Sequence, residues 1–132
     1  MFGKTTKWYK TAYKAYRKKK MSDEYRTLFR YYIDVCLFNP IRVADGHYDF
    51  LALDDMDGLT KATTEDLRKL LPGHLFENYL AALEVYKTIG EEYDEEKLNL
   101  IQEKDDYLAD HAEELESILI AYVNELKEQK IV

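Results

Sequence analysis

The sequence predicts an all-α protein with a four-helix-bundle-like body and a basic helical arm at its N-terminus. Only two prolines and five glycines occur in 132 residues, so long stretches contain no helix breaker. Apolar residues recur at spacings of three and four in several of these stretches, which is the helical period. The first 30 residues hold ten basic and two acidic side chains, whereas the other 102 hold nine basic and 24 acidic ones. We therefore divide the chain into a basic arm, residues 1–21, and an acidic helical bundle, residues 22–132.

The arm reads as a helix with two chemically different faces. At 100° per residue its basic side chains fall within an arc of about 140°, and an aromatic group falls within a separate arc of about 60°. The basic set is Lys4, Lys7, Lys10, Lys14, Arg17 and Lys18, and the aromatic set includes Tyr9, Tyr13 and Tyr16. An isolated helix of this length is marginal, and like charges at these spacings repel, so we expect the arm to order only against a partner.

The body begins with a helix that Ser22 caps, with Asp23 and Glu24 in its first turn. Its apolar stripe runs to Cys36, and Asn39-Pro40 is predicted to end it. Residues 40–62 show the least regular pattern. We predict a long, partly packed loop there, with residues 48–53 as a short strand or a turn of helix.

Three further helical segments follow. Thr64 is predicted to cap a short helix that ends at Pro72-Gly73. Residues 74–89 form the next helix, with Gly90 as its stop. Residues 93–129 contain neither glycine nor proline, which predicts one long helix or two helices joined by a kink near Asp105 and Asp106. Asp105 is the one polar residue in the apolar stripe of this segment.

No pattern in the sequence indicates an enzyme, a metal site or a cofactor. We find no glycine-rich phosphate loop and no nucleophile beside a base. The single cysteine, Cys36, lies in an apolar run and is predicted to be a buried thiol. His47, His74 and His111 are far apart in sequence, and we find no histidine pair or His–Glu pair at metal-binding spacing on one helix. The apolar run at residues 118–123 is far shorter than the roughly 20 residues of a spanning helix.

The cationic face of the arm predicts binding to a phosphate backbone without sequence preference. The arm is rich in lysine and carries no known base-reading motif. An anionic membrane is an alternative target, because lysine with tryptophan and tyrosine also occurs at membrane interfaces. A second alternative is a small non-enzymatic regulator or inhibitor whose bundle binds a protein. Trp8 lies between the two faces and is open to contact with the body, a neighbouring subunit or a sugar edge.

A lysine- and tyrosine-rich helical arm before a small acidic helical body resembles the major coat proteins of filamentous archaeal viruses, the lipothrixvirus and rudivirus lineage. The layout is most similar to one of the paired coat proteins of the Acidianus filamentous virus type, and it covers the whole chain. The resemblance implies a virion protein, assembled in the host cytoplasm, that wraps linear double-stranded DNA and forms a helical filament as a heterodimer with a second related coat protein. It also implies possible contact with a lipid envelope.

Carried onto this sequence, the resemblance implies two groups of site residues. The DNA-binding group is Lys4, Lys7, Lys10, Lys14, Arg17, Lys18, Lys19, Lys20, Arg26 and Arg30, and the subunit-interface group is Trp8, Tyr9, Tyr13 and Tyr16.

Overall fold

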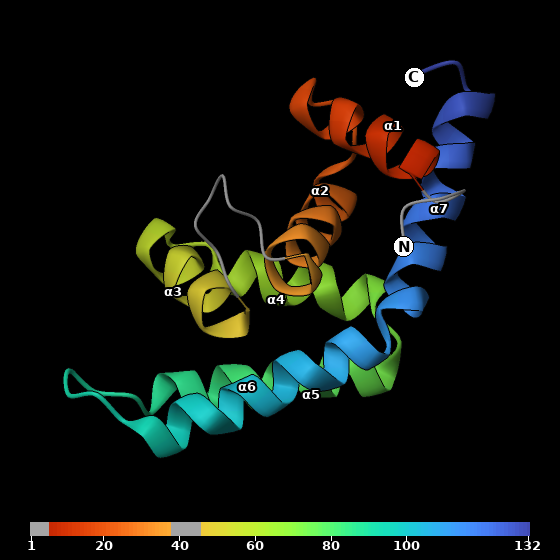
Figure 1. The fold of residues 1–132 in the computed structure, drawn as a ribbon. Coiled ribbons are helices and arrows are strands. Elements are labelled where there is room, and N and C mark those ends of the chain that lie inside the picture. The colour runs from red at the N-terminus through yellow and green to blue at the C-terminus, as the bar shows by residue number, and fades with distance from the viewer. Residues whose placement is uncertain (1–5, 38–45) are drawn as a thin grey trace.

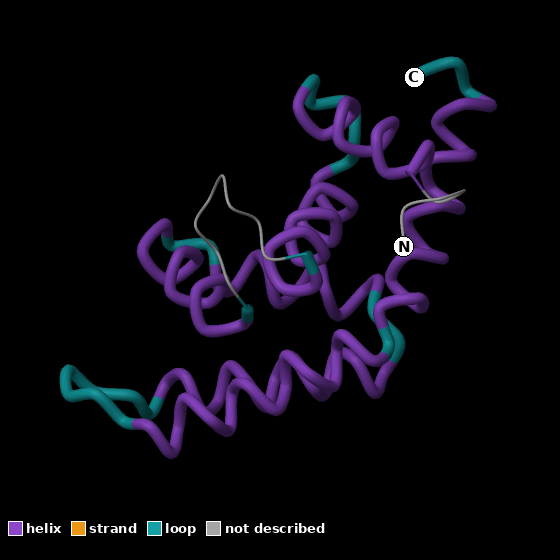
Figure 2. Tube along the Cα trace, viewed as in Figure 1, coloured by secondary structure: helices purple, strands orange, loops and turns teal. Residues whose placement is uncertain are grey.

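The computed structural model describes residues 6–37 and 46–132, and within these ranges it contains helices, turns and coil but no strand (Figures 1 and 2). The helices are α1 (Thr6–Arg17), α2 (Asp23–Tyr31), the π-helical turn η1 (Tyr32–Cys36), α3 (His47–Asp57), α4 (Thr60–Leu70), α5 (Gly73–Lys87), α6 (Glu95–Asp110) and α7 (Ala112–Glu128). The prediction of an all-α, bundle-like fold is confirmed.

The helices form a base, a middle layer and an upright part (Figure 1). Helices α5 and α6 run antiparallel as the base, and α3 packs against both of them. Helices α2 and α4 pack against each other in the middle layer. Helix α7 turns away from the end of α6, and α1 lies against both α7 and α2. The two ends of the described chain therefore lie in the same part of the molecule.

Aromatic side chains from three helices meet at the centre of the body. Tyr31 is fully buried, and its ring lies 5.1 Å from that of Phe50 and 5.8 Å from that of Tyr79, both in edge-on geometry. Edge-on pairs of this kind suit the charge distribution of aromatic rings and add to the gain from apolar burial. Tyr31 thus joins α2 to α3 and α5.

Helix α3 is a complete helix, so our prediction of a loop with a strand or a single helical turn is wrong. Its start is capped from a distant helix. The backbone N–H of His47 donates to Asp105 Oδ1 at 2.7 Å, and the His47 ring Nδ1 lies 2.6 Å from the same oxygen. Asp105 is 58 residues away, so no local pattern reveals this cap. The contact also explains why one polar residue interrupts the apolar stripe of α6.

Gly46, directly before α3, makes this approach possible. It has φ +94°, and a Cβ atom at this position would collide with the Asp105 carboxylate. The second ring nitrogen of His47, Nε2, lies 2.6 Å from the Tyr31 hydroxyl oxygen. The buried chain Tyr31–His47–Asp105 therefore ties α2, α3 and α6 together.

Two helix boundaries also differ from the predictions. The predicted long C-terminal segment does divide in two, but the break is at His111, with φ −116° and ψ 18°, and not near Asp105. Helix α4 begins at Thr60, so the predicted cap at Thr64 is wrong. The predicted helix end at Asn39-Pro40 lies outside the described residues.

Candidate nucleic-acid interface

Helix α1 is anchored to the body by a buried stripe that sequence reasoning did not single out. Trp8, Ala12 and Ala15 follow one another at spacings of four and three and are 7%, 0% and 1% exposed. The two alanines allow the backbone of α1 to lie close to its neighbours. The Trp8 ring lies 5.7 Å from that of Tyr32. Trp8 therefore belongs to the core of its own chain, which is one of the contacts left open by the sequence, and its assignment to a subunit interface stays a prediction.

The tyrosines of α1 also contact their own chain. Tyr9, Tyr13 and Tyr16 are half-buried, and their ring centroids lie 5.8, 6.4 and 5.4 Å from that of Phe29 on α2. We expected the arm to need a partner in order to become helical, and the structure provides contacts for it within the chain. A role for the exposed edges of these tyrosines in subunit contacts stays a prediction.

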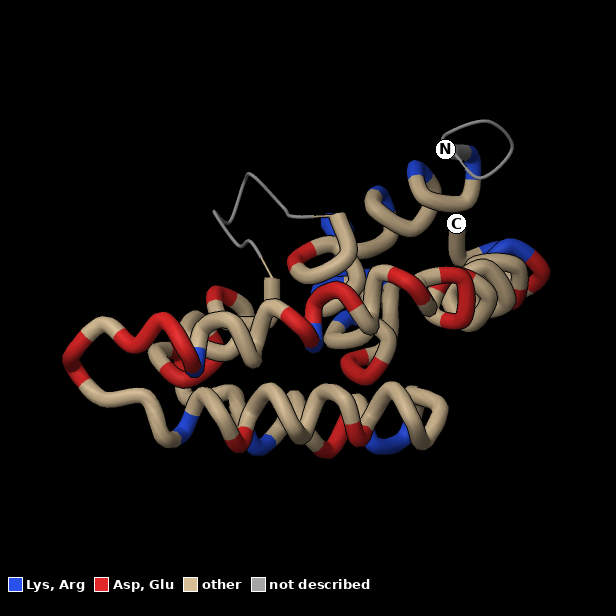
Figure 3. The backbone as a smooth tube through the Cα atoms, turned by 60° about the horizontal axis from the view of Figure 1, so that its bottom comes forward, with Lys and Arg blue, Asp and Glu red and all other residues tan. Residues whose placement is uncertain are grey.

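The basic residues of α1 are exposed, whereas the stripe of Trp8, Ala12 and Ala15 is buried. Figure 3 marks the basic positions along the backbone in blue. No acidic residue occurs in α1 or in the turn that follows it. We call this surface the cationic surface, and it consists of the exposed Lys7, Lys10, Lys14, Arg17, Lys18, Lys19 and Lys20. Lys4, which we predicted as part of the same face, lies outside the described residues.

Two hollows flank α1, and basic side chains line both of them. On one side the lining includes Lys14, Lys18, Lys20 and, from the last turn of α7, Lys127. No acidic residue lines either hollow. Lys127 extends the cationic surface onto α7, and sequence reasoning missed it because only the tertiary packing of α7 on α1 brings it there. On the other side the lining is Tyr9, Lys10, Tyr13, Lys14, Arg17 and Lys18.

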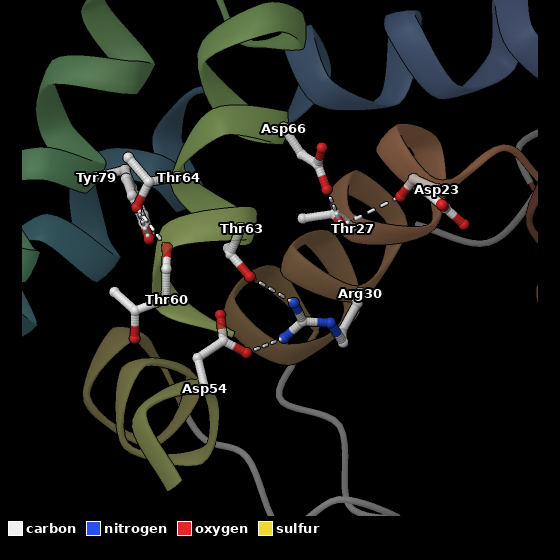
Figure 4. A network of polar contacts seen from close by, with 9 residues as sticks. All are labelled: Asp23, Thr27, Arg30, Asp54, Thr60, Thr63, Thr64, Asp66 and Tyr79. Carbon is white, nitrogen blue, oxygen red and sulfur yellow. Dashed lines mark hydrogen bonds and ion pairs between the residues drawn. The ribbon is translucent and has the colours of Figure 1, made fainter. Parts of the chain in front are cut away.

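Arg26 and Arg30 are bonded inside the chain, and their assignment to the DNA-binding group stays a prediction. Arg26 donates to the Tyr16 carbonyl oxygen at 2.7 Å and lies over the Tyr16 ring, so it closes the end of α1. Arg30 pairs with Asp54 at 2.7 Å and donates to Thr63 Oγ1 at 3.0 Å (Figure 4). Both guanidinium groups hold the helices together.

Two groups of a kind used in catalysis lie within the fold, one of them buried and the other partly buried. The hydrogen-bonded side chains of Tyr31, His47 and Asp105 are chemically similar to a catalytic proton relay. Tyr31 and His47 are fully buried, however, so no substrate can reach them. Burial raises the pKa of the Cys36 thiol to about 12, so at neutral pH almost no reactive thiolate forms. We assign the relay to structure, since it caps α3, and Cys36 to packing.

One group of side chains has the composition of a metal site. His74, His111 and Glu114 each offer a ligand atom, and these atoms lie within 4.8 Å of one another. His111 and Glu114 are three residues apart, but His111 lies in the turn before α7, so this pair does not contradict the prediction that no His–Glu pair has metal-binding spacing on one helix. The closeness of this pair is visible in the sequence, whereas the approach of His74 depends on the tertiary fold.

Comparisons of the chain with protein-family models, with curated proteins and with solved structures gave no match. Among the helices of the described ranges, none has both the length and the apolar character needed to cross a bilayer.

Proposed function

We propose that this protein is a virion structural protein that coats linear double-stranded DNA without sequence preference and assembles into a helical filament. The observation that carries the proposal is the cationic surface on α1, which contains no acidic residue and faces solvent while the opposite side of the helix is buried. Such a surface can replace the counterions of a phosphate backbone. The resemblance in layout to coat proteins of filamentous archaeal viruses supports the virion setting.

The distribution of charge also supports a coat function. A coat has to bind every sequence, and contacts to phosphates carry no sequence information. Residues 31–132 hold nine basic and 24 acidic side chains, so the body repels DNA and directs it to α1. Each copy can bind weakly, since many linked copies on one duplex add their contacts.

Two sets of charge-neutralising substitutions test the DNA-binding part. The test set changes Lys7, Lys10 and Lys14 on α1 and Lys18 in the turn directly after it to Gln, and all four side chains are exposed. The matched control set changes Lys61, Arg68, Lys69 and Lys87 to Gln, which are exposed on α4 and α5 and remove the same total charge. We expect the test set to lose most of its affinity for duplex DNA and the control set to keep it. Equal losses in both sets would contradict the assignment of the surface.

Assembly and target class are tested separately. Electron microscopy of the protein with linear double-stranded DNA should show regular filaments, if necessary after addition of a second coat protein.

Vesicles of anionic lipid at the same salt concentration test the membrane alternative. Because Tyr9, Tyr13 and Tyr16 pack on Phe29, little apolar surface of α1 is left to enter a bilayer, and we expect weaker binding to vesicles than to DNA. Tight vesicle binding without DNA binding, or a bundle that binds neither, would favour the alternatives.

A further inference from the structure

Three helices bring a two-histidine, one-carboxylate group together at the point where α7 turns away from α6. His74 is the second residue of α5, His111 separates α6 from α7, and Glu114 lies in the first turn of α7. His74 Nε2 lies 2.8 Å from Glu114 Oε1, and the two imidazole rings have centroids 5.1 Å apart. Two imidazole nitrogens and a carboxylate oxygen form the ligand set of many zinc sites that keep a fourth position open.

The hydrogen bonds around His111 prepare it as a ligand. Its Nδ1 lies 2.8 Å from the Tyr107 carbonyl oxygen, which can only accept a hydrogen bond. The proton is therefore on Nδ1, and the lone pair on Nε2 is available to a cation. Metal-binding histidines commonly donate their second ring N–H to a backbone carbonyl or a carboxylate in this way.

His74 has a partner on each ring nitrogen. Without a metal, Nε2–H donates to Glu114, and Nδ1 accepts from the Tyr107 hydroxyl at 2.8 Å. A cation between His74 and Glu114 would replace their Nε2–H···O hydrogen bond. The cation would then be bonded to His74 Nε2 and to a carboxylate oxygen of Glu114. The Nε2 proton leaves, Nδ1 takes up a proton, and Tyr107 then accepts the hydrogen bond instead of donating it.

We propose that His74, His111 and Glu114 bind a divalent cation of the zinc class at the junction of α5, α6 and α7. The ligand atoms have to close from within 4.8 Å to the roughly 3.3 Å between neighbouring ligands of a tetrahedral zinc ion. His74 is exposed and the other two are half-buried, so their side chains have room to rotate and solvent can fill the fourth position. Nitrogen ligands select against Mg²⁺ and Ca²⁺, which prefer oxygen.

A cation at this junction would fix the direction in which α7 leaves α6. Helix α7 packs against α1 and carries Lys127, so the angle at His111 contributes, together with the packing of α1 on α2, to how the cationic surface sits relative to the base of the molecule. Cation binding at this junction is independent of DNA binding, because the ligand group lies outside α1.

The test is a titration of chelator-treated, tag-free protein with Zn²⁺ by calorimetry and with Co²⁺ by visible absorption. We expect one ion per chain, a tetrahedral cobalt spectrum and a higher Tm with Zn²⁺ but not with Mg²⁺. His74→Gln, His111→Gln and Glu114→Gln should each lower the affinity at least tenfold. Glu113→Gln, an exposed carboxylate in the same turn, is the matched control and should leave the affinity unchanged.

Circular dichroism of each variant without metal checks that the fold is kept, since all four positions are exposed or half-buried. Zinc binding of equal affinity in the wild type and in the double variant His74→Gln, His111→Gln would overturn the proposal. So would an octahedral cobalt spectrum, because it would show an ion held mainly by water.

Discussion

Asp54 has a buried carboxylate, and its ion pair with Arg30 decides how much that burial costs. Asp54 is 1% exposed, and only its Oδ1 is paired, while Oδ2 has no hydrogen-bond partner among the described residues. Arg30 also stacks on the Phe50 ring, 4.7 Å from its centroid. A buried pair of this kind contributes little net stability when it is complete, but removal of one partner leaves an uncompensated charge.

Arg30→Met should therefore be strongly destabilising. Methionine keeps much of the volume but leaves Asp54 unpaired, and we expect a loss of about 3 kcal/mol in the free energy of unfolding. Urea denaturation followed by circular dichroism measures it. The double variant Arg30→Met, Asp54→Leu should recover most of the loss, since no buried charge remains. A loss below about 1 kcal/mol, as at an exposed ion pair, would contradict the structural role of Arg30.

The Cys36 thiol should be unreactive in the folded protein. Burial raises its pKa to about 12, so the thiolate that attacks alkylating reagents is scarce at pH 8. Iodoacetamide should modify Cys36 slowly in buffer and rapidly in denaturant, as mass spectrometry would show. Rapid modification of the folded protein would show that Cys36 is more accessible than the structure indicates.

For single residues, the sequence predicts the character of the immediate surroundings but not the partners that lie far away in the chain. The apolar run around Cys36 predicts a buried thiol, and in the structure Cys36 is partly buried against the core. The partners of Asp105 and Arg30 lie on other helices, 58 and 24 residues away, and a charged residue carries no sign of which distant group will meet it. The group of His74, His111 and Glu114 was not predicted for the same reason: His111 and Glu114 are close in sequence, but only the fold brings His74 to them.

Helix α1 is an element whose stability depends on its contacts with α2 and α7. Its buried stripe belongs to the same hydrophobic cluster as the residues of the body. The basic and aromatic faces predicted from the sequence agree with its exposure pattern, since the basic residues are exposed and the tyrosines half-buried. Periodicity separates faces well, but it does not say which neighbour each face meets.

Trp8 is the single tryptophan, so its fluorescence reports the docking of α1 directly. We expect the urea transition seen by Trp8 fluorescence to coincide with the transition seen by far-ultraviolet circular dichroism, because α1 shares the core of the body. An earlier fluorescence transition would mean that α1 detaches before the body unfolds, as a separate arm would. Lys10→Gln, on the exposed face, should leave both transitions in place.

Helix α3 shows where element prediction failed. Its start depends on Gly46 and on the distant Asp105, so the local pattern suggested a loop. The remaining helices have their own periodic stripes or breakers, and only their boundaries moved.

At the scale of the whole molecule, buried tyrosines should make the fold sensitive to alkali. Burial raises the pKa of Tyr31, Tyr32 and Tyr79 above the usual value near 10, and a hydrogen bond to Glu116 raises that of Tyr32 further. Above pH 10 the unfolded chain releases these protons and the folded chain retains them. Stability is therefore full below pH 10 and falls as the pH rises, by about 1.4 kcal/mol per pH unit for each such tyrosine.

Ultraviolet absorption of tyrosinate during a pH titration measures this directly. The buried tyrosines should ionise only together with the loss of the helical signal. A single smooth ionisation of all tyrosines near pH 10, with the helices intact, would contradict the packing of the core.

The separation of charge between α1 and the body is the property of the whole molecule on which the proposed function depends. The most direct test is the salt dependence of binding to duplex DNA of random sequence. With six to eight phosphate contacts, the logarithm of the affinity should fall against the logarithm of the salt concentration with a slope of about −5 to −7. The variant with Gln at positions 7, 10, 14 and 18 should lose about 0.9 of that slope per lysine. A slope near zero, or one that this variant leaves unchanged, would contradict the account.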